Sequence, residues 1–500
     1  MSIESFCLKR LCSILTLIKV YPESLAHSHA MNTVTELAHL REWIARFDKP
    51  GPRYTSYPTA DRFVEAYDED AYRVALQRRE QLSSHFGGMA GSGPLSLYVH
   101  IPFCASICYY CACNKVITKN HGQAAKYLDY LEKEIDLTLP SIGGTQKVTH
   151  LHWGGGSPTF LSIAEIRRLF EFLRSRFELD PDGEYAIEID PRTTAPGTIT
   201  ELVELGFTRL SIGVQDFDPQ VQRAVHRIQP ADMTIRTMEE ARAAGIDSIN
   251  LDLIYGLPFQ TRASFAKTLD AVLALQPERI ALYSYAHLPE RFKPQRRINA
   301  QDLPAPQEKV ELFLNAQQRL LDAGYVYIGM DHFARPDDEL ARAMKTGQLH
   351  RNFQGYSTQA ETDLVAFGVS AISKIGTSYS QNDRSLDSYY DALDQGKLPV
   401  VRGLTLSIDD LIRRSVIMAL MCQGEVSFEA IEQAYLISFT QYFEAELSSL
   451  APFQEAGFIQ RSARWLSITE VGRLFVRPIA ALFDRYLRED VARRKYSKMI

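Results

Sequence analysis

The stretch "LSLYVHIPFCASICYYCAC", residues 95–113, joins an apolar run to a dense group of thiols. Its first part, residues 95–101, is rich in β-branched, aromatic and leucine side chains, which is typical of a buried strand. The second part carries four of the chain's seven cysteines, at positions 104, 108, 111 and 113. A loop with so many thiols directly after a strand predicts a metal or iron–sulfur centre at the strand's end.

Beyond this strand, short apolar runs alternate with stretches of helical periodicity. Alternating β and α segments require parallel strands joined by right-handed crossovers, and the ligands of such sheets lie at the carboxyl ends of the strands. The fold class predicted is α/β: a partial (β/α)6 TIM-like barrel with an N-terminal arm and a smaller, mostly helical C-terminal domain. The six strands are expected at residues 95–101, 148–153, 185–189, 209–214, 248–254 and 279–283.

The unusual residues of the chain follow these strands, as this fold requires. Glycine triplets, carboxylates, prolines and aromatic residues cluster where each apolar run ends. These six segments are therefore expected to meet at one edge of the barrel: "IPFC" (101–104), "GGGSP" (154–158), "EIDPR" (188–192), "GVQDF" (213–217), "DLIYGLP" (252–258) and "YSYAHLP" (283–289).

The chain is expected to divide into four regions. Residues 1–30 are interpreted as a disordered extension or a start codon assigned too early. Residues 31–93 form an arm with helices at 33–47 and 69–81, and the prolines of "KPGPRYTSYPTA" (49–60) exclude a helix or central strand between them. Residues 94–385 form the catalytic barrel. Residues 386–500 form the helical domain, with a short strand-like segment at 458–469.

Composition restricts the possible partners. The chain has 500 residues, 45% of them hydrophobic, and a formal net charge of -6. It therefore has no overall basic field to attract nucleic acid. The apolar run "LCSILTLI" (11–18) is too short to span a bilayer, so no stable membrane association is expected. An odd number of cysteines does not suit a secreted disulfide framework, and we expect a cytoplasmic monomer.

The spacing C-x3-C-x2-C of Cys104, Cys108 and Cys111 suits one kind of centre best. Three thiolates can hold three corners of a 4Fe-4S cube and leave the fourth iron open to another ligand. A zinc site with Cys113 as the fourth ligand remains an alternative. The three cysteines could also lie, unreactive, on one buried helical face.

This cysteine pattern, with an aromatic residue before the third cysteine, resembles the signature of the radical S-adenosylmethionine (SAM) superfamily. Further motifs resemble the oxygen-independent coproporphyrinogen III oxidase family within it, over residues 50–500. They are "LYVHIPFC…C…C-x-C", "LHWGGGSPT", "IEIDPR", "SIGVQDF", "LDLIYGLP", "YAHLP", "MDHFARPDDELA" and "HRNFQGYSTQ".

The resemblance implies a 4Fe-4S cluster on Cys104, Cys108 and Cys111 and two SAM molecules. The first SAM would contact Tyr98, Gly155, Glu188, Ala286 and Ile372. The second would contact Tyr110, Gly156, Ser157, Gln215, Arg227 and Asp252. Catalytic roles are implied for Tyr98, Cys113, Gln354 and Ile372. Tyr110 stands where the family can have phenylalanine and Ser157 where it can have threonine, and both changes keep the aromatic ring or the hydroxyl.

The activity implied is oxidative decarboxylation of the ring A and B propionates of coproporphyrinogen III, giving protoporphyrinogen IX without oxygen. The electron donor and acceptor cannot be named. Four substrate carboxylates call for arginine forks, and the candidates are Arg53, Arg335 and Arg351. The alternative is a haem-binding chaperone of the same superfamily without oxidase activity. Cys113 and the "PRYTSYP" arm favour the oxidase.

Overall fold

The computed structural model describes residues 42–44, 46–85, 93–144, 146–358, 362–489, 496 and 499. Contacts divide the chain into two compact units. The large unit comprises residues 60–342 and 359–405, and the small unit comprises residues 1–59, 343–358 and 406–500. The extension predicted at 1–30 lies outside the described residues, as does most of the helix predicted at 33–47.

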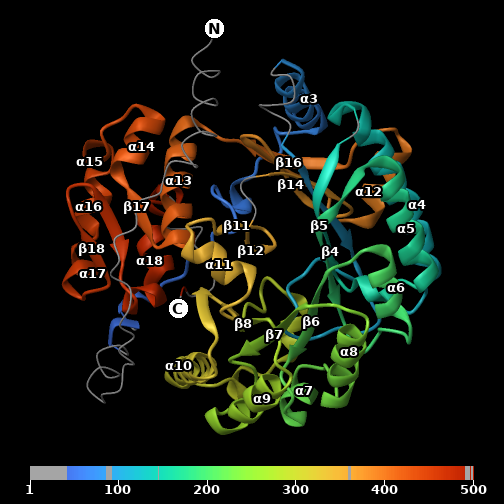
Figure 1. Cartoon of the computed structure of the whole chain (residues 1–500), viewed down its shortest axis with the longest axis horizontal. Coiled ribbons are helices and arrows are strands. Elements are labelled where there is room, and N and C mark those ends of the chain that lie inside the picture. Colours follow the sequence, from blue (N-terminus) through green and yellow to red (C-terminus); the bar gives the residue numbers. More distant parts are fainter. Residues whose placement is uncertain are drawn as a thin grey trace. The chain divides into compact units, whose positions relative to one another are not determined.

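The large unit is built on one twelve-stranded sheet (Figure 1). All six predicted strands are confirmed, and they are consecutive parallel neighbours. The parallel α/β core expected from the alternating pattern is therefore present. Its strands are β1 (Leu95–Ile101), β4 (Lys147–Gly155), β5 (Glu178–Ile189), β6 (Arg209–Gln215), β7 (Ser248–Tyr255) and β8 (Arg279–Ser284).

Helices connect the parallel strands and cover one face of the sheet (Figure 1). In α5, for example, Ser162 and Glu165 form a capping box, and the side chains of Ile166, Leu169 and Leu173 are buried. Their spacing places them on one helical face, toward the sheet. The connecting helices are α4 (Gly122–Ile142), α5 (Ile163–Arg176), α6 (Thr198–Leu205), α7 (Pro219–Ala224), α8 (Ala231–Ala243) and α9 (Arg262–Ala274).

The strands have one apolar and one polar face. In β6, Leu210, Ile212 and Val214 are buried, whereas Ser211 and Gly213 between them are only half-buried. Because successive side chains of a strand point to opposite faces, the apolar set packs under the helices and the polar set lines the inside of the barrel. The predicted site residues on the strands, such as Tyr98, Glu188 and Asp252, belong to this inner set.

Further strands extend both edges of the core. β13 (Asp363–Phe367) is parallel to β1, and β14 (Ile372–Ile375), β15 (Ser378–Asn382) and β16 (Val400–Thr405) follow it. The large unit therefore continues past residue 386, where the helical domain was expected to begin, because β16 pairs with β15. The other edge carries β10 (His332–Ala334) and β9 (Val326–Gly329) after α10 (Pro306–Asp322).

The segment before β1 also differs from the expected arm. The predicted second helix is confirmed as α3 (Glu69–His85), but it packs on α4, β14 and β16 and so belongs to the large unit. Residues 51–59 form neither helix nor strand, as their prolines predicted. They belong to the small unit, where Tyr54 and Tyr57 are fully buried and Arg477 donates to the carbonyls of Gly51 and Pro52.

The small unit is mostly helical, as expected. Its three-stranded sheet comprises β17 (Glu425–Ser427), β19 (Trp465–Ile468) and β18 (Ile459–Arg461), so the strand-like segment at 458–469 forms two strands. A β11–β12 hairpin (His350–Asn352, Gly355–Ser357) belongs to the same unit. Its main helices are α13 (Ile408–Gln423), α14 (Phe428–Tyr435), α15 (Phe439–Tyr442), α16 (Glu444–Ser449), α17 (Ala451–Glu455), α18 (Val476–Ala481) and α19 (Arg485–Glu489).

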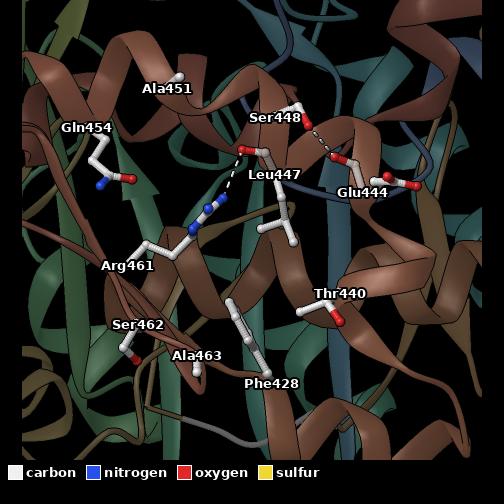
Figure 2. A pocket seen from close by; sticks show the side chains of 10 residues that line it. All are labelled: Phe428, Thr440, Glu444, Leu447, Ser448, Ala451, Gln454, Arg461, Ser462 and Ala463. Carbon is white, nitrogen blue, oxygen red and sulfur yellow. Dashed lines mark hydrogen bonds between the residues drawn. The ribbon is translucent and has the colours of Figure 1, made fainter.

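A cavity of about 650 Å³ lies within the small unit (Figure 2). Phe428, Leu447 and Arg461 contribute to its walls, and Arg461 Nη1 donates to the Leu447 carbonyl at 3.1 Å. None of the predicted site residues lines it.

Among the helices of the described ranges, none is both long and apolar enough to cross a membrane.

Candidate cofactor site at the carboxyl ends of the strands

The cysteine loop leaves β1 and is held by two short strands, β2 (Phe103–Cys104) and β3 (Val116–Ile117). Residues 105–113 form bends and turns, so the alternative of three inert cysteines on one helical face is wrong. Cys104 and Cys111 are half-buried and Cys108 is buried, whereas Cys113 is exposed. The three cysteines of the C-x3-C-x2-C pattern thus differ from the fourth in their surroundings.

The chemistry of this loop suits a polynuclear cluster. Burial raises the pKa of Cys104 to about 12. A hydrogen bond with Cys113 lowers the pKa of Cys111 to about 6. Only the thiolate form is a ligand, so the raised pKa of Cys104 opposes cluster binding. The lowered pKa of Cys111 and the cationic side chains beside the loop favour an anionic iron–sulfur group.

Two arginines reach the buried thiol of this loop. Arg192 Nη2 donates to Cys108 Sγ at 3.4 Å, and Arg227 Nη1 donates to it at 3.7 Å. Asp190 binds both guanidinium groups, and it follows the last residue of β5. Sequence reasoning quoted the "EIDPR" motif but assigned no role to Asp190 or Arg192.

The glycine turn lies at the end of β4. Gly155 has φ +118°, and its N–H donates to Glu188 Oε2 at 3.2 Å. A Cβ at Gly155 would lie 2.6 Å from the His100 ring, and one at Gly156 would lie 2.5 Å from the Pro102 carbonyl oxygen. The protein's own packing therefore requires glycine at both positions, in addition to any ligand that approaches the turn.

The inner face near the strand ends carries a group of rings and a carboxylate. Tyr98 donates to or accepts from His100 Nδ1 at 3.1 Å and stacks on His152, with ring centroids 5.8 Å apart. His152 Nε2 lies 3.6 Å from Glu188 Oε1. Burial lowers the pKa of His100. Sequence reasoning missed both histidines, although their positions two residues from Tyr98 and Gly154 place them on the same inner face.

Asp252 lies on β7 and contributes a second carboxylate to this face. Its carboxylate accepts from Ser211 Oγ at 3.2 Å and from Asn250 Nδ2 at 2.8 Å. Burial, and next the charge of Glu188, raise the pKa of Asp252 to about 7. Gln215 ends the neighbouring strand with φ +70°. The structure thus places Asp252 and Gln215 at the same edge of the barrel as the glycine turn.

The remaining predicted residues have diverse surroundings. Ser157 is buried, with its hydroxyl 3.2 Å from Thr159 Oγ1. Tyr110 packs against an apolar cluster that includes Val225 and Ile254. Ala286 follows β8 in the "YSYAHLP" segment.

The two remaining positions lie on later segments of the chain. Ile372 begins β14. Gln354 lies in the turn between β11 and β12 of the small unit, whereas the barrel residues belong to the large unit.

The three candidate arginines are not gathered together. Arg53 and Arg351 belong to the small unit, where Arg351 Nε donates to the Arg53 carbonyl at 3.3 Å. Arg335 follows β10, and its N–H donates to the carbonyl of Glu278, one residue before β8 begins. Arg335 is therefore at the amino end of the barrel strands, opposite the predicted site.

The barrel residues 98–272 match the model of the radical SAM superfamily, and residues 406–475 match that of the HemN C-terminal domain. The chain is 51% identical to the oxygen-independent coproporphyrinogen III oxidase of Pseudomonas aeruginosa over 91% of its length and 98% of that protein's. Its identity to the enzyme of Escherichia coli with this name is 45%, over 91% and 97%.

A solved structure gives the same result. The structure described as "Coproporphyrinogen III oxidase (HemN) from Escherichia coli is a Radical SAM enzyme" superposes with a TM-score of 0.83 at 46% identity. It covers 87% of this chain, and the chain covers 97% of it. Similarity of this extent includes both units, the cysteine loop and the glycine turn. The chain therefore belongs to the oxygen-independent coproporphyrinogen III oxidase family of the radical SAM superfamily.

Proposed function

We propose that this chain decarboxylates the ring A and B propionates of coproporphyrinogen III oxidatively and without oxygen, giving protoporphyrinogen IX in haem biosynthesis. The observation that carries the proposal is the arrangement at one barrel edge. The loop of Cys104, Cys108 and Cys111 leaves β1, and the glycine turn ends the adjacent β4. No amino-acid side chain can break an unactivated C–H bond, so the reaction needs a cofactor.

When bound, the reduced 4Fe-4S cluster and SAM supply a 5'-deoxyadenosyl radical that removes hydrogen from the propionate carbon beta to the carboxylate. Cys104, Cys108 and Cys111 would hold the cluster. The barrel residues would position SAM and exclude water from the reacting carbon. An electron acceptor outside this chain would take the remaining electron after carbon dioxide leaves.

We also propose that the site holds two SAM molecules, in the residues assigned above. The buried Nε of Arg227 has no hydrogen-bond partner among the described residues, which supports a ligand there, because an unpaired buried donor is costly. Asp252 offers a carboxylate to an ammonium or ribose group. Arg227→Ala and Asp252→Ala should each lower the SAM stoichiometry and preserve the iron content. Unchanged stoichiometry and turnover in both variants would remove the second SAM.

For a substrate carboxylate, we propose Arg351 as the first candidate. The buried Nη1 of Arg351 has no hydrogen-bond partner within the described residues, and its guanidinium carbon lies 4.7 Å from the Tyr356 ring centre. A planar fork held by an aromatic ring is suited to binding a propionate. Arg53 is the second candidate. Arg351→Lys should raise KM for coproporphyrinogen more than it lowers kcat.

The four cysteines test the cluster assignment. Alanine at Cys104, Cys108 or Cys111 should abolish iron content, the 4Fe-4S absorbance and SAM cleavage together, because a cube that loses one of three protein ligands is poorly held. Cys113→Ser should keep the cluster and is the direct comparison for the three alanine variants, since Cys113 is exposed on the same loop. If Cys113→Ser loses iron as completely as the three alanine variants, all four irons of the cluster are ligated by the protein. That result would refute the radical mechanism.

The haem-chaperone alternative is tested by substrate. An anaerobic assay should show loss of coproporphyrinogen III and formation of protoporphyrinogen IX by the reconstituted protein. Stoichiometric haem binding without any such turnover would favour the chaperone. The relatives at 41% to 51% identity carry the oxidase name, and the alternative is not favoured.

A further inference from the structure

The buried thiol of Cys108 receives hydrogen bonds from two guanidinium groups. Arg192 Nη2 lies 3.4 Å from Cys108 Sγ, and Arg192 Nη1 lies 3.4 Å from the hydroxyl of Ser106 on the same loop. Arg227 Nη1 lies 3.7 Å from the same sulfur. Both arginines come from segments that follow barrel strands, so tertiary structure alone brings them to the cysteine loop.

Asp190 holds both arginines in place. Its carboxylate accepts from Arg192 Nε at 3.0 Å and from Arg192 Nη2 at 2.7 Å. It also accepts from Arg227 at 3.2 and 3.3 Å, and Arg227 is fixed further by the Gly213 carbonyl at 2.7 Å. Burial raises the pKa of Asp190, but Arg227 and Arg192 outweigh burial and lower it to about 2. The carboxylate is therefore charged, and the guanidinium groups cannot easily swing away.

The arrangement is unequal among the three cysteines. Within the described ranges, no arginine donates to the sulfur of Cys104 or Cys111, although Lys115 lies beside Cys111 and its charge lowers the pKa of that thiol. Around Cys108, two positive charges face one carboxylate, which leaves a net positive charge beside the sulfur. One-electron reduction makes an iron–sulfur cluster more negative. Donors and positive charge at a ligand sulfur stabilise that reduced form and raise the reduction potential.

We infer that Arg192, anchored by Asp190, is a positioning residue that raises the reduction potential of the cluster held through Cys108. The inference rests on the proposed function, since it requires the cluster. Arg192 is the better probe of the pair because Arg227 is also assigned to SAM. A higher potential makes the cluster easier to reduce by a low-potential one-electron donor.

The test compares Arg192→Ala, Arg192→Lys and Arg192→Gln with wild type after anaerobic reconstitution. Iron and sulfide are counted first, and the midpoint potential is then measured by titration with titanium(III) citrate, followed by the EPR signal of the reduced cluster. Arg176→Ala is the matched control, because Arg176 pairs with Asp136 at 2.7 Å on an outer helix and donates to no thiol of the described residues.

We expect wild-type iron and sulfide content in Arg192→Ala and a midpoint potential more negative than that of wild type. Lysine keeps the charge and loses the fork, so Arg192→Lys should shift less than Arg192→Ala. The control should match wild type. The cluster signal reports this shift whether or not the variants turn over.

Three results overturn the inference. The first is a wild-type potential in Arg192→Ala. If that variant holds no cluster, wild-type potentials in Arg192→Lys and Arg192→Gln overturn it equally. Loss of the cluster from all three variants, with normal content in Arg176→Ala, would make Arg192 a residue that retains the cluster and would also overturn a tuning role. A wild-type protein that takes up no cluster refutes the proposed function instead.

Discussion

Glu134 on α4 is a buried carboxylate whose titration should be visible in the stability of the large unit. It is 3% exposed and accepts from the Gly368 N–H at 2.7 Å, from Asn382 Nδ2 at 2.6 Å and from Tyr389 Oη at 2.6 Å. These contacts join α4 to the loop that leads to Ile372, one of the residues assigned to SAM. A change at Glu134 therefore acts on the large unit and on the loop that precedes Ile372.

Burial raises the pKa of Glu134 from 4.5 to about 7, against the hydrogen bonds from Tyr389, Gly368 and Asn382. Between these two values the folded state keeps a proton that the unfolded state has lost. The resulting stabilisation is complete below pH 4.5 and is lost as the pH rises to about 7. At about 1.4 kcal/mol per pH unit, the loss amounts to about 3 kcal/mol.

Glu134→Gln removes this titration, so the difference in unfolding free energy between wild type and variant isolates it. We expect wild type to lose about 3 kcal/mol relative to Glu134→Gln from pH 4.5 to pH 7.5. The chain has three tryptophans, and Trp153, fully buried in β4, is the one in the large unit. Urea unfolding followed by its fluorescence, in a background with Trp43→Phe and Trp465→Phe, measures the large unit alone.

Glu171→Gln is the control, because Glu171 is an exposed carboxylate that pairs with Arg174 at 3.0 Å. The unfolding free energy of Glu171→Gln should change with pH in the same way as that of wild type. The reasoning is refuted if wild type and Glu134→Gln also run parallel, because the carboxylate would then have the same pKa in the folded and unfolded states. A constant offset between the two curves would reflect only the changed hydrogen bonds.

Gly155→Ala should weaken SAM binding at least about tenfold and preserve the iron content, because the added Cβ would lie 2.6 Å from the His100 ring. Anaerobic equilibrium dialysis measures the SAM affinity, and a wild-type affinity would contradict this prediction. Because the pKa of Asp252 is raised to about 7, the charged fraction of its carboxyl group grows about tenfold from pH 6 to pH 8. The SAM affinity of wild type should rise over this range relative to that of Asp252→Asn. Identical pH profiles of the two proteins would count against a contact between Asp252 and SAM. Arg477→Ala should expose the residue 51–59 segment to trypsin after Arg53, because it loses two carbonyl contacts there, and wild-type resistance to trypsin would show that other contacts hold the segment.

Much of the large unit could be predicted because its signals are local. Apolar runs predict the six parallel strands at their observed places, and the distinctive residues that follow them lie at one edge of the barrel. The cysteine loop was recognised because three thiols lie within eight consecutive positions, 104–111. Periodicity and spacing act over a few residues, and a single chain is enough to read them.

The domain boundary was less predictable. Residues 386–405 contain a helical pattern followed by an apolar run. In sequence, this pattern does not show whether the segment belongs to the α/β unit or to the helical unit. Pairing of β16 with β15 decided that they belong to the large unit. Likewise, Arg335 was a reasonable candidate by residue type, and only its contact with Glu278 placed it at the wrong end of the strands.

By itself, the sequence determined the α/β class, the six strands and the thiols that a cluster needs, because each is encoded in neighbouring residues. Only the tertiary structure decided what surrounds those thiols. Arg192 is 84 residues from Cys108 and Asn382 is 248 residues from Glu134, and no local pattern joins such pairs. Strand order and helix packing bring them within hydrogen-bonding distance, and burial there sets the charge and pKa of each group.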